Sequence, residues 1–246
     1  MRALIVDDEA PARARLSTLL EELGVEIVGE AANGLEALEL SRDRRPDVLF
    51  LDVSMPEVDG FDVARHLADP RPLIVFQTAY SEFAVKAFEH EALDYLVKPV
   101  TRERLAQAID RIARRTPAAT RRWSAGELAT LGEAIGHVPA RPERLLVRHG
   151  TAHRLVPVAE IERFNAGEGM VYAHVGTSLH GTDYTLNELE ERLRGAFVRT
   201  SRSDLVSIPH VKTIASNGDG SATLTLASGA TVRVSRRRAA AVRKAF

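Results

Sequence analysis

Five polar residues stand at or just after the end of a short apolar run, where strands of a parallel sheet would end: Asp7, Asp8, Asp52, Thr78 and Lys98. In open α/β sheets, functional groups collect at the carboxyl ends of the strands, so we expect these side chains to meet at one edge. Three carboxylates at one edge repel each other unless a hard cation lies between them, and Mg²⁺ favours carboxylates together with water and phosphate oxygens. Lys98 and Thr78 can then hold phosphoryl oxygens. The pattern therefore indicates phosphoryl transfer to a carboxylate, which forms an aspartyl phosphate.

An alternation of apolar strands and helices must position these five residues. Val48–Leu51 is four apolar residues in a row, which is typical of a strand buried on both faces. Pro11 suits the first turn of a helix that Gly24 ends, and Asn33 suits a helix cap. We expect strands at 3–6, 25–29, 48–51, 73–76 and 93–97. We expect helices at 11–23, after Asn33, at 61–67, from Ser81 through Phe83, Val85 and Phe88, and at 105–112. Parallel strands require such crossovers, so these units predict a doubly wound α/β domain.

The motifs at the strand ends resemble the signature of a two-component response-regulator receiver domain with a flavodoxin-like fold. They are Asp7-Asp8, Asp52–Pro56, Asp59-Gly60, Thr78-Ala79 and Lys98-Pro99. The resemblance covers residues 1–116 and implies that Asp52 is the phosphoacceptor and Lys98 pairs with the phosphoryl group. It implies Mg²⁺ ligands at Asp8, Asp52 and the Ser54 backbone carbonyl, with Asp7 acting through a metal-bound water. Thr78 and Tyr95 match switch positions, where the hydroxyl follows the phosphoryl group and the ring rotates inward. The alternative for Tyr95 is a half-buried packing aromatic.

Composition separates the chain into an acidic front and a basic back. Its 246 residues suit two domains. Its net charge of −1 combines −7 over residues 1–116, +1 over residues 117–141 and +5 over residues 142–246. A basic domain makes a polyanion a plausible partner. The absence of cysteine excludes disulfides and thiol nucleophiles. Acidic residues near the start and the lack of an apolar run approaching 18 residues predict a cytoplasmic protein without membrane contact.

Residues 117–141 are expected to form a linker between the two domains. Three prolines, Pro117, Pro139 and Pro142, surround a short helical pattern in which Ser124–Glu127 fits a capping box. The sole tryptophan, Trp123, precedes this pattern. An isolated helix of this length is marginal without a partner surface.

From residue 142 the apolar period changes from 3.6 toward 2, which indicates a mostly β domain. We expect a hairpin of 145–148 and 153–156 around Gly150-Thr151, and further strands at 160–166, 170–175, 197–199, 205–207, 211–215, 222–226 and 231–234. Thr185–Glu188 predicts a capping box that opens a short helix, and Ser235 is expected to cap a basic final helix. No adjacent helix pair supports a helix-turn-helix.

Three segments of this half resemble the LytTR DNA-binding domain: Val158–Val175, Phe197–Ile214 and Thr231–Arg238. Together with the receiver order they resemble the LytR/AlgR family of transcriptional regulators. The resemblance implies a largely β fold that reads DNA with loops, as a homodimer on paired sites. It puts base contacts at Gly169, Met170, Val171, Ser201, Arg202, Arg236 and Arg237. Arg199, Lys212, Arg238, Arg243 and Lys244 are expected at the DNA backbone. Met170 and Val171 depart from the polar or aromatic residues common in the first loop.

We therefore expect a transcriptional regulator rather than an enzyme, with a sensor histidine kinase and promoter DNA as partners and Mg²⁺ as cofactor. One rival is a phosphatase of the haloacid-dehalogenase type, but those enzymes require a second Asp two residues after the first, where this chain has Ser54. Another rival is a receiver joined to a protein-binding β domain. The charge of residues 142–246 and the basic final helix favour DNA.

Overall fold

The computed structural model describes residues 1–79, 94–114, 127–128, 142–150 and 152–246. The chain divides into two compact units, Met1–Val138 and Pro139–Phe246. Two expectations lie outside the described residues: the helix from Ser81, and most of the linker pattern with Trp123. Of that pattern, Glu127 and Leu128 are described and helical. Among the described residues, no helix has the length and apolar character that a membrane crossing requires.

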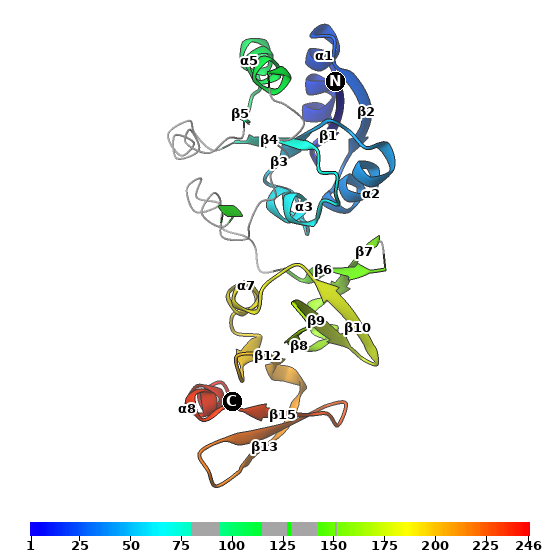
Figure 1. Cartoon of the computed structure of the whole chain (residues 1–246). Helices are drawn as coiled ribbons and strands as arrows, with labels where there is room; N and C mark the ends of the chain where they lie inside the picture. The colour runs from blue at the N-terminus through cyan, green and yellow to red at the C-terminus, as the bar shows by residue number, and fades with distance from the viewer. Residues whose placement is uncertain (80–93, 115–126, 129–141, 151) are drawn as a thin grey trace. The chain divides into compact units, whose positions relative to one another are not determined.

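The first unit is a five-stranded parallel sheet in the order β2-β1-β3-β4-β5. Its strands are β1 (Arg2–Val6), β2 (Glu26–Ala31), β3 (Val48–Asp52), β4 (Leu73–Thr78) and β5 (Asp94–Val97). The helices are α1 (Ala10–Glu22), α2 (Gly34–Arg44), α3 (Gly60–His66) and α5 (Arg102–Ala113). Helices α1 and α5 pack together on one face of the sheet and α2 and α3 on the other (Figure 1). The predicted doubly wound α/β domain is confirmed.

The core of this unit explains why β3 carries an uninterrupted apolar run. All five β3 residues are buried, because the strand lies in the middle of the sheet with helices on both faces. Helix starts follow the sequence signals: Asn33 Oδ1 accepts from the Glu36 N–H at 2.9 Å, and Asp59 Oδ1 accepts from the Asp62 N–H at 2.7 Å.

The second unit contains a seven-stranded sheet in the order β11-β12-β8-β9-β10-β6-β7. Its strands are β6 (Arg144–His149), β7 (Ala152–Pro157), β8 (Ile161–Gly167), β9 (Met170–Val175), β10 (Ser178–Thr182), β11 (Phe197–Arg199) and β12 (Asp204–Ser207). A 3₁₀ turn at Val158–Glu160 precedes β8. Helix α7 (Leu186–Arg192) opens with the predicted capping box at Thr185 and Glu188, and its leucines pack into the core of this sheet.

A three-stranded antiparallel sheet of order β13-β14-β15 completes the second unit. It comprises β13 (Val211–Ser216), β14 (Ala222–Leu226) and β15 (Thr231–Val234), after a 3₁₀ turn at Ile208–His210. The final helix α8 (Arg236–Lys244) lies beside this sheet (Figure 1). Its Ala239 and Val242 belong to the apolar core that the sheet forms. The mostly β prediction is confirmed.

Two local expectations need correction. Strand β10 was not predicted, because Ser178–Thr182 lacks an apolar alternation and its one large apolar residue, Leu179, is 60% exposed. Backbone pairing with β9 holds this strand instead. Ser235 occupies the N-cap position of α8, but its side chain makes no capping hydrogen bond, so the expected side-chain cap is wrong.

Candidate functional site

Three carboxylates meet at the carboxyl edge of the parallel sheet. Asp7 and Asp8 follow β1, Asp52 ends β3, and the two strands are neighbours. One oxygen of each carboxylate lies within 4.8 Å of the others. Asp7 is 1% exposed and Asp52 4% exposed, whereas Asp8 faces solvent. The convergence predicted from the strand ends is therefore present.

Lys98 bridges two of these carboxylates. Its Nζ lies 2.7 Å from Asp52 Oδ2, to which it donates a hydrogen bond, and 2.7 Å from Asp7 Oδ2. Burial acts to lower the pKa of Lys98, but its two carboxylate partners outweigh burial and raise that pKa above its ordinary value. Burial raises the pKa of Asp52, and Lys98 offsets only part of this. Among the described residues, the cluster thus has three carboxylates and the one ammonium of Lys98, which pairs with two of them, and this leaves an excess of negative charge.

The donor set fits a hard divalent cation. Asp7 Oδ2 is a buried carboxylate oxygen that has the ion pair with Lys98 but accepts no hydrogen bond from the described residues. Asp7 Oδ1 accepts from the Glu9 N–H at 3.0 Å, and Asp52 Oδ1 accepts from the Ser54 N–H at 3.2 Å. Clustered carboxylate oxygens are ligands that Mg²⁺ takes in proteins, so the chemistry of this cluster fits the ion.

Backbone contacts hold Asp52 in place. The loop after β3 returns so closely that a Cβ on Gly60 would lie 2.3 Å from the Asp52 carbonyl oxygen. Gly60 also donates its N–H to the Val53 carbonyl at 3.0 Å. Only a residue without a side chain fits this close approach. Arg13, which sequence reasoning missed, donates from Nη1 to the Asp7 carbonyl at 2.7 Å; its position within α1 carries no sequence signal for this contact.

Thr78 and Tyr95 lie on the neighbouring strands β4 and β5. Thr78 is 2% exposed, and its carbonyl accepts the Lys98 N–H at 2.8 Å. Tyr95 is half-buried, with the Arg104 guanidinium 5.9 Å from the centre of its ring. Thr78 therefore adjoins Lys98 along the backbone, at the same sheet edge as Asp52.

Most residues predicted to contact DNA are accessible on the second unit. Gly169, Lys212, Arg202, Arg236 and Arg237 are exposed, and Met170 and Ser201 are half-buried. Some of these side chains already have partners within the chain. Lys212 Nζ donates to the Ala227 carbonyl at 3.0 Å, and Arg236 lies 3.6 Å from Asp219.

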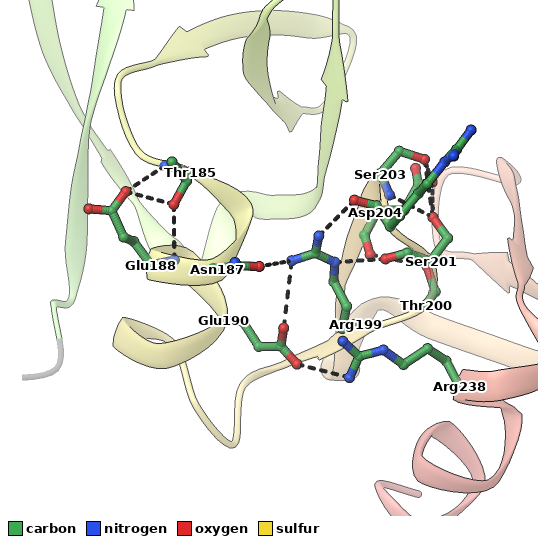
Figure 2. A network of polar contacts seen from close by, with 11 residues as sticks. Thr185, Asn187, Glu188, Glu190, Arg199, Thr200, Ser201, Ser203, Asp204 and Arg238 are labelled. Atoms are coloured by element: carbon green, nitrogen blue, oxygen red, sulfur yellow. Dashed lines mark hydrogen bonds and ion pairs between the residues drawn. The ribbon is translucent and has the colours of Figure 1, made fainter. Parts of the chain in front are cut away.

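Arg199 does not lie on the surface as predicted. It is 8% exposed, and its guanidinium points into a network of polar residues from α7, the β11–β12 loop and α8 (Figure 2). Nε donates to the Ser201 carbonyl and Nη2 to the Arg202 carbonyl, both at 2.7 Å. The expected contact between Arg199 and the DNA backbone is thus corrected: this side chain is used inside the domain.

Family comparisons divide the chain at the same region as its fold. Residues 3–110 match the response regulator receiver domain, and residues 152–246 match the LytTr DNA-binding domain. The transcriptional regulatory protein BtsR of Salmonella typhi is 36% identical over 244 residues, which cover 96% of this chain and 95% of that protein. An uncharacterized response regulatory protein of Vibrio cholerae is 34% identical over 241 residues, covering 96% and 94%.

Among solved structures, the response regulatory domain of protein mrkE from Klebsiella pneumoniae is 37% identical to the aligned part of this chain. It covers 46% of this chain and 95% of its own, with a TM-score of 0.41.

Proposed function

The chain belongs to the response regulators that join a receiver domain to a LytTR DNA-binding domain, and on this premise we propose that Asp52 is its phosphoacceptor. Such a chain is a phosphorylation-controlled transcriptional regulator of a two-component system. We assign residues 1–116 to the receiver, 117–141 to a linker and 142–246 to the DNA-binding domain. The observation that carries the proposal is the position of Asp52, buried beside Lys98 and two further carboxylates.

In the reaction, an Asp52 carboxylate oxygen attacks phosphorus and the bond from phosphorus to the leaving group breaks. The leaving group is the phosphohistidine imidazole of a sensor kinase, or acetate when acetyl phosphate is the donor. The Lys98 ammonium lies where the negatively charged phosphoryl group arrives. This ammonium can therefore exchange its contact with Asp52 for a contact with a phosphoryl oxygen. The chain accepts one phosphoryl group and does not turn over a substrate.

The group that completes this site is Mg²⁺, which neutralises charge on the phosphoryl oxygens when bound. Asp8, Asp52 and the Ser54 carbonyl would hold it, and Asp7 would act through a water. The support for this assignment is the excess of carboxylates over ammonium groups within the cluster.

We assign the switch to Thr78 and Tyr95. The Thr78 hydroxyl follows the new phosphoryl group, and the Tyr95 ring moves inward beside it, which changes the surface around β5 and the helix predicted from Ser81. Pairing of two receivers in a homodimer would then raise the local concentration of the second DNA-binding domain. This output acts on promoter DNA in the cytoplasm.

On the DNA side, we assign base contacts to the loops around Gly169-Met170 and Ser201-Arg202 and to Arg236-Arg237. Their exposed arginines can pair with guanine through two N–H groups. Lys212 is assigned to the DNA backbone, which positions the domain without reading sequence.

Labelling with acetyl phosphate and Mg²⁺ tests the phosphoacceptor. Wild-type chain should take up one phosphoryl group, and Asp52→Asn should take up none, because the attacking oxygen is lost. Asp43→Asn is a matched control, since Asp43 is exposed on α2 and pairs with Arg42. Undiminished labelling of the Asp52→Asn chain would refute the assignment.

Alanine substitution of Arg202 and Arg237 tests the DNA contacts. Each change should weaken binding to a selected duplex by about 1–3 kcal/mol, because a bidentate base contact is lost. Arg194→Ala is the matched control, since Arg194 is 80% exposed and pairs with Glu191. Unchanged sequence preference in both variants would exclude base reading by Arg202 and Arg237. Binding that does not weaken as salt rises would favour a protein partner instead of DNA.

A further inference from the structure

Arg199 is a charged residue kept almost entirely out of solvent. It ends β11, and its side chain is 8% exposed. A buried guanidinium requires partners for its N–H groups, because an unpaired buried charge is strongly destabilising. Figure 2 shows what supplies these partners: Asn187 and Glu190 of α7 on one side, and the loop that follows Arg199 on the other.

The loop Thr200–Ser203 depends on Arg199 for two of its carbonyl groups. Nε donates to the Ser201 carbonyl and Nη2 to the Arg202 carbonyl, each at 2.7 Å. The rest of the loop is bound to Asp204, whose carboxylate accepts from the Ser201 hydroxyl at 2.8 Å. Arg199 thus binds the backbone of this short loop and Asp204 binds its Ser201 side chain, while the Arg202 side chain is exposed.

The same network reaches the start of α8. Glu190 lies 3.6 Å from Arg199 Nη1 through one carboxylate oxygen and 3.5 Å from Arg238 Nη1 through the other. The Ser235 N–H donates to the Thr200 carbonyl at 2.9 Å. Arg202 lies in the loop Thr200–Ser203, and Arg237 lies in the first turn of α8. The same set of contacts therefore fixes the position of the Arg202 backbone relative to the Arg237 backbone.

We propose that Arg199 is a positioning residue for DNA recognition: it fixes loop Thr200–Ser203 so that Arg202 is presented to its base, and Glu190 extends this control to α8. The inference rests on the proposed DNA contacts of Arg202 and Arg237. Its physical basis is geometric. A planar guanidinium presents donors at fixed directions to both carbonyls and still reaches Asn187, whereas an ammonium is a point charge on a flexible stem. A loop that is ordered before binding loses less entropy when it meets DNA.

The test compares Arg199→Lys with the wild-type full chain on two duplexes. One duplex is selected from a random pool by the wild-type chain, and the other is a scrambled duplex of the same composition. Lysine keeps the charge beside Glu190 but lacks the planar fork that directs N–H groups at both loop carbonyls and at Asn187. We expect the ratio of affinities for the two duplexes to fall roughly 10-fold, which is within the discrimination of one bidentate base contact. Affinity for the scrambled duplex and the salt dependence of binding should stay as in the wild type.

Two results would overturn this inference. If Arg199 contacted a phosphate, Arg199→Lys would change both affinities by the same factor, and the ratio of the two affinities would stay as in the wild type. If Arg199 only stabilised the fold, the melting temperature and the DNA-competent fraction would fall while the affinity ratio of the competent protein stayed constant. The competent fraction is measured by stoichiometric titration, so partial unfolding does not hide the answer.

Two further variants keep the outcomes separate. Glu190→Gln keeps the size of the side chain but removes the charge between Arg199 and Arg238, and should lower the ratio by a smaller factor than Arg199→Lys. A normal ratio in both Glu190→Gln and Arg199→Lys would refute the positioning role. Arg202→Ala is measured beside them. If Arg202→Ala leaves the affinity ratio unchanged, base reading by Arg202 is refuted. If Arg202→Ala lowers the ratio but Arg199→Lys leaves it normal, only the positioning role of Arg199 is refuted.

Discussion

Replacing Lys98 by methionine removes the only cation that contacts two buried carboxylates among the described residues. Lys98 Nζ lies 2.7 Å from both Asp7 Oδ2 and Asp52 Oδ2, and these aspartates are 1% and 4% exposed. At an effective dielectric constant of about 20, each contact has a Coulomb energy of about 6 kcal/mol. Much of this is offset because Lys98 must itself be desolvated. Removing one partner of a buried ion pair destabilises by about 3–5 kcal/mol, and we expect that loss for Lys98→Met without divalent cations.

Magnesium should reverse part of this loss. In Lys98→Met, the Lys98 ammonium no longer offsets the negative charge of the three carboxylates. Bound Mg²⁺ should therefore stabilise this variant more than it stabilises the wild type. At 100 times its dissociation constant, a ligand that binds only the folded state stabilises by about 2.7 kcal/mol. Hydrogen exchange of peptides from β1 and β3 in the full chain measures this, because it reports on the receiver without the second unit.

Arg102→Met is the matched control for Lys98→Met. Arg102 lies 3.7 Å from Glu22, but both side chains are more than half exposed, and such surface pairs contribute about 0–1 kcal/mol. A loss of under about 1 kcal/mol for Lys98→Met would refute the reasoning from burial and charge. Equal stabilisation of wild type and variant by Mg²⁺ would show that the cation does not bind at these carboxylates.

Three further changes test local contacts. Ser228→Ala removes a hydroxyl that donates to Glu162 Oε2 at 2.7 Å. Burial acts to raise the pKa of Glu162, but the hydrogen bonds that Glu162 accepts from Ser228 outweigh burial and lower this pKa. Because the pKa of Glu162 is lower in the folded state, its ionised carboxylate stabilises the fold at pH values above its unfolded pKa of about 4.3. This stabilisation disappears as the pH falls through the folded-state pKa. In urea unfolding, Ser228→Ala should therefore lower the free energy of unfolding by about 1–2 kcal/mol at pH 7 and by less in acid. Gly60→Ala should destabilise the receiver by about 1–3 kcal/mol and slow labelling of Asp52, because its Cβ would lie 2.3 Å from the Asp52 carbonyl. Thr185→Ala should reduce the stability of the second unit by about 1 kcal/mol in urea unfolding, because the capping box of α7 is lost. Stabilities equal to the wild type would contradict each prediction.

The candidate phosphorylation site could be predicted because its residues follow uninterrupted apolar runs. A run such as Val48–Leu51 is typical of a strand covered on both faces, and neighbouring parallel strands bring their carboxyl ends together. The sequence pattern did not show that Lys98 lies equally close to Asp7 and Asp52, since that depends on the path of the chain after β5.

The role of Arg199 could not be predicted, because burial depends on residues distant along the chain. Arg199 and Arg202 are three residues apart and of the same type, yet one is buried and the other exposed. The difference comes from Asn187 and Glu190 of α7, which lie beside β11 only in the folded domain. Strand β10 escaped prediction for a similar reason, since its neighbour β9 supplies the pairing that its own sequence does not indicate.

The most direct test of the central claim measures DNA affinity of the full chain before and after phosphorylation by acetyl phosphate and Mg²⁺. The selected duplex is the probe, with the Asp52→Asn chain treated in parallel. We predict that phosphorylation changes the affinity of the wild-type chain for this duplex and leaves that of Asp52→Asn unchanged. The same change in both chains, or phosphorylated wild-type chain with unaltered affinity, would contradict control of DNA binding through Asp52.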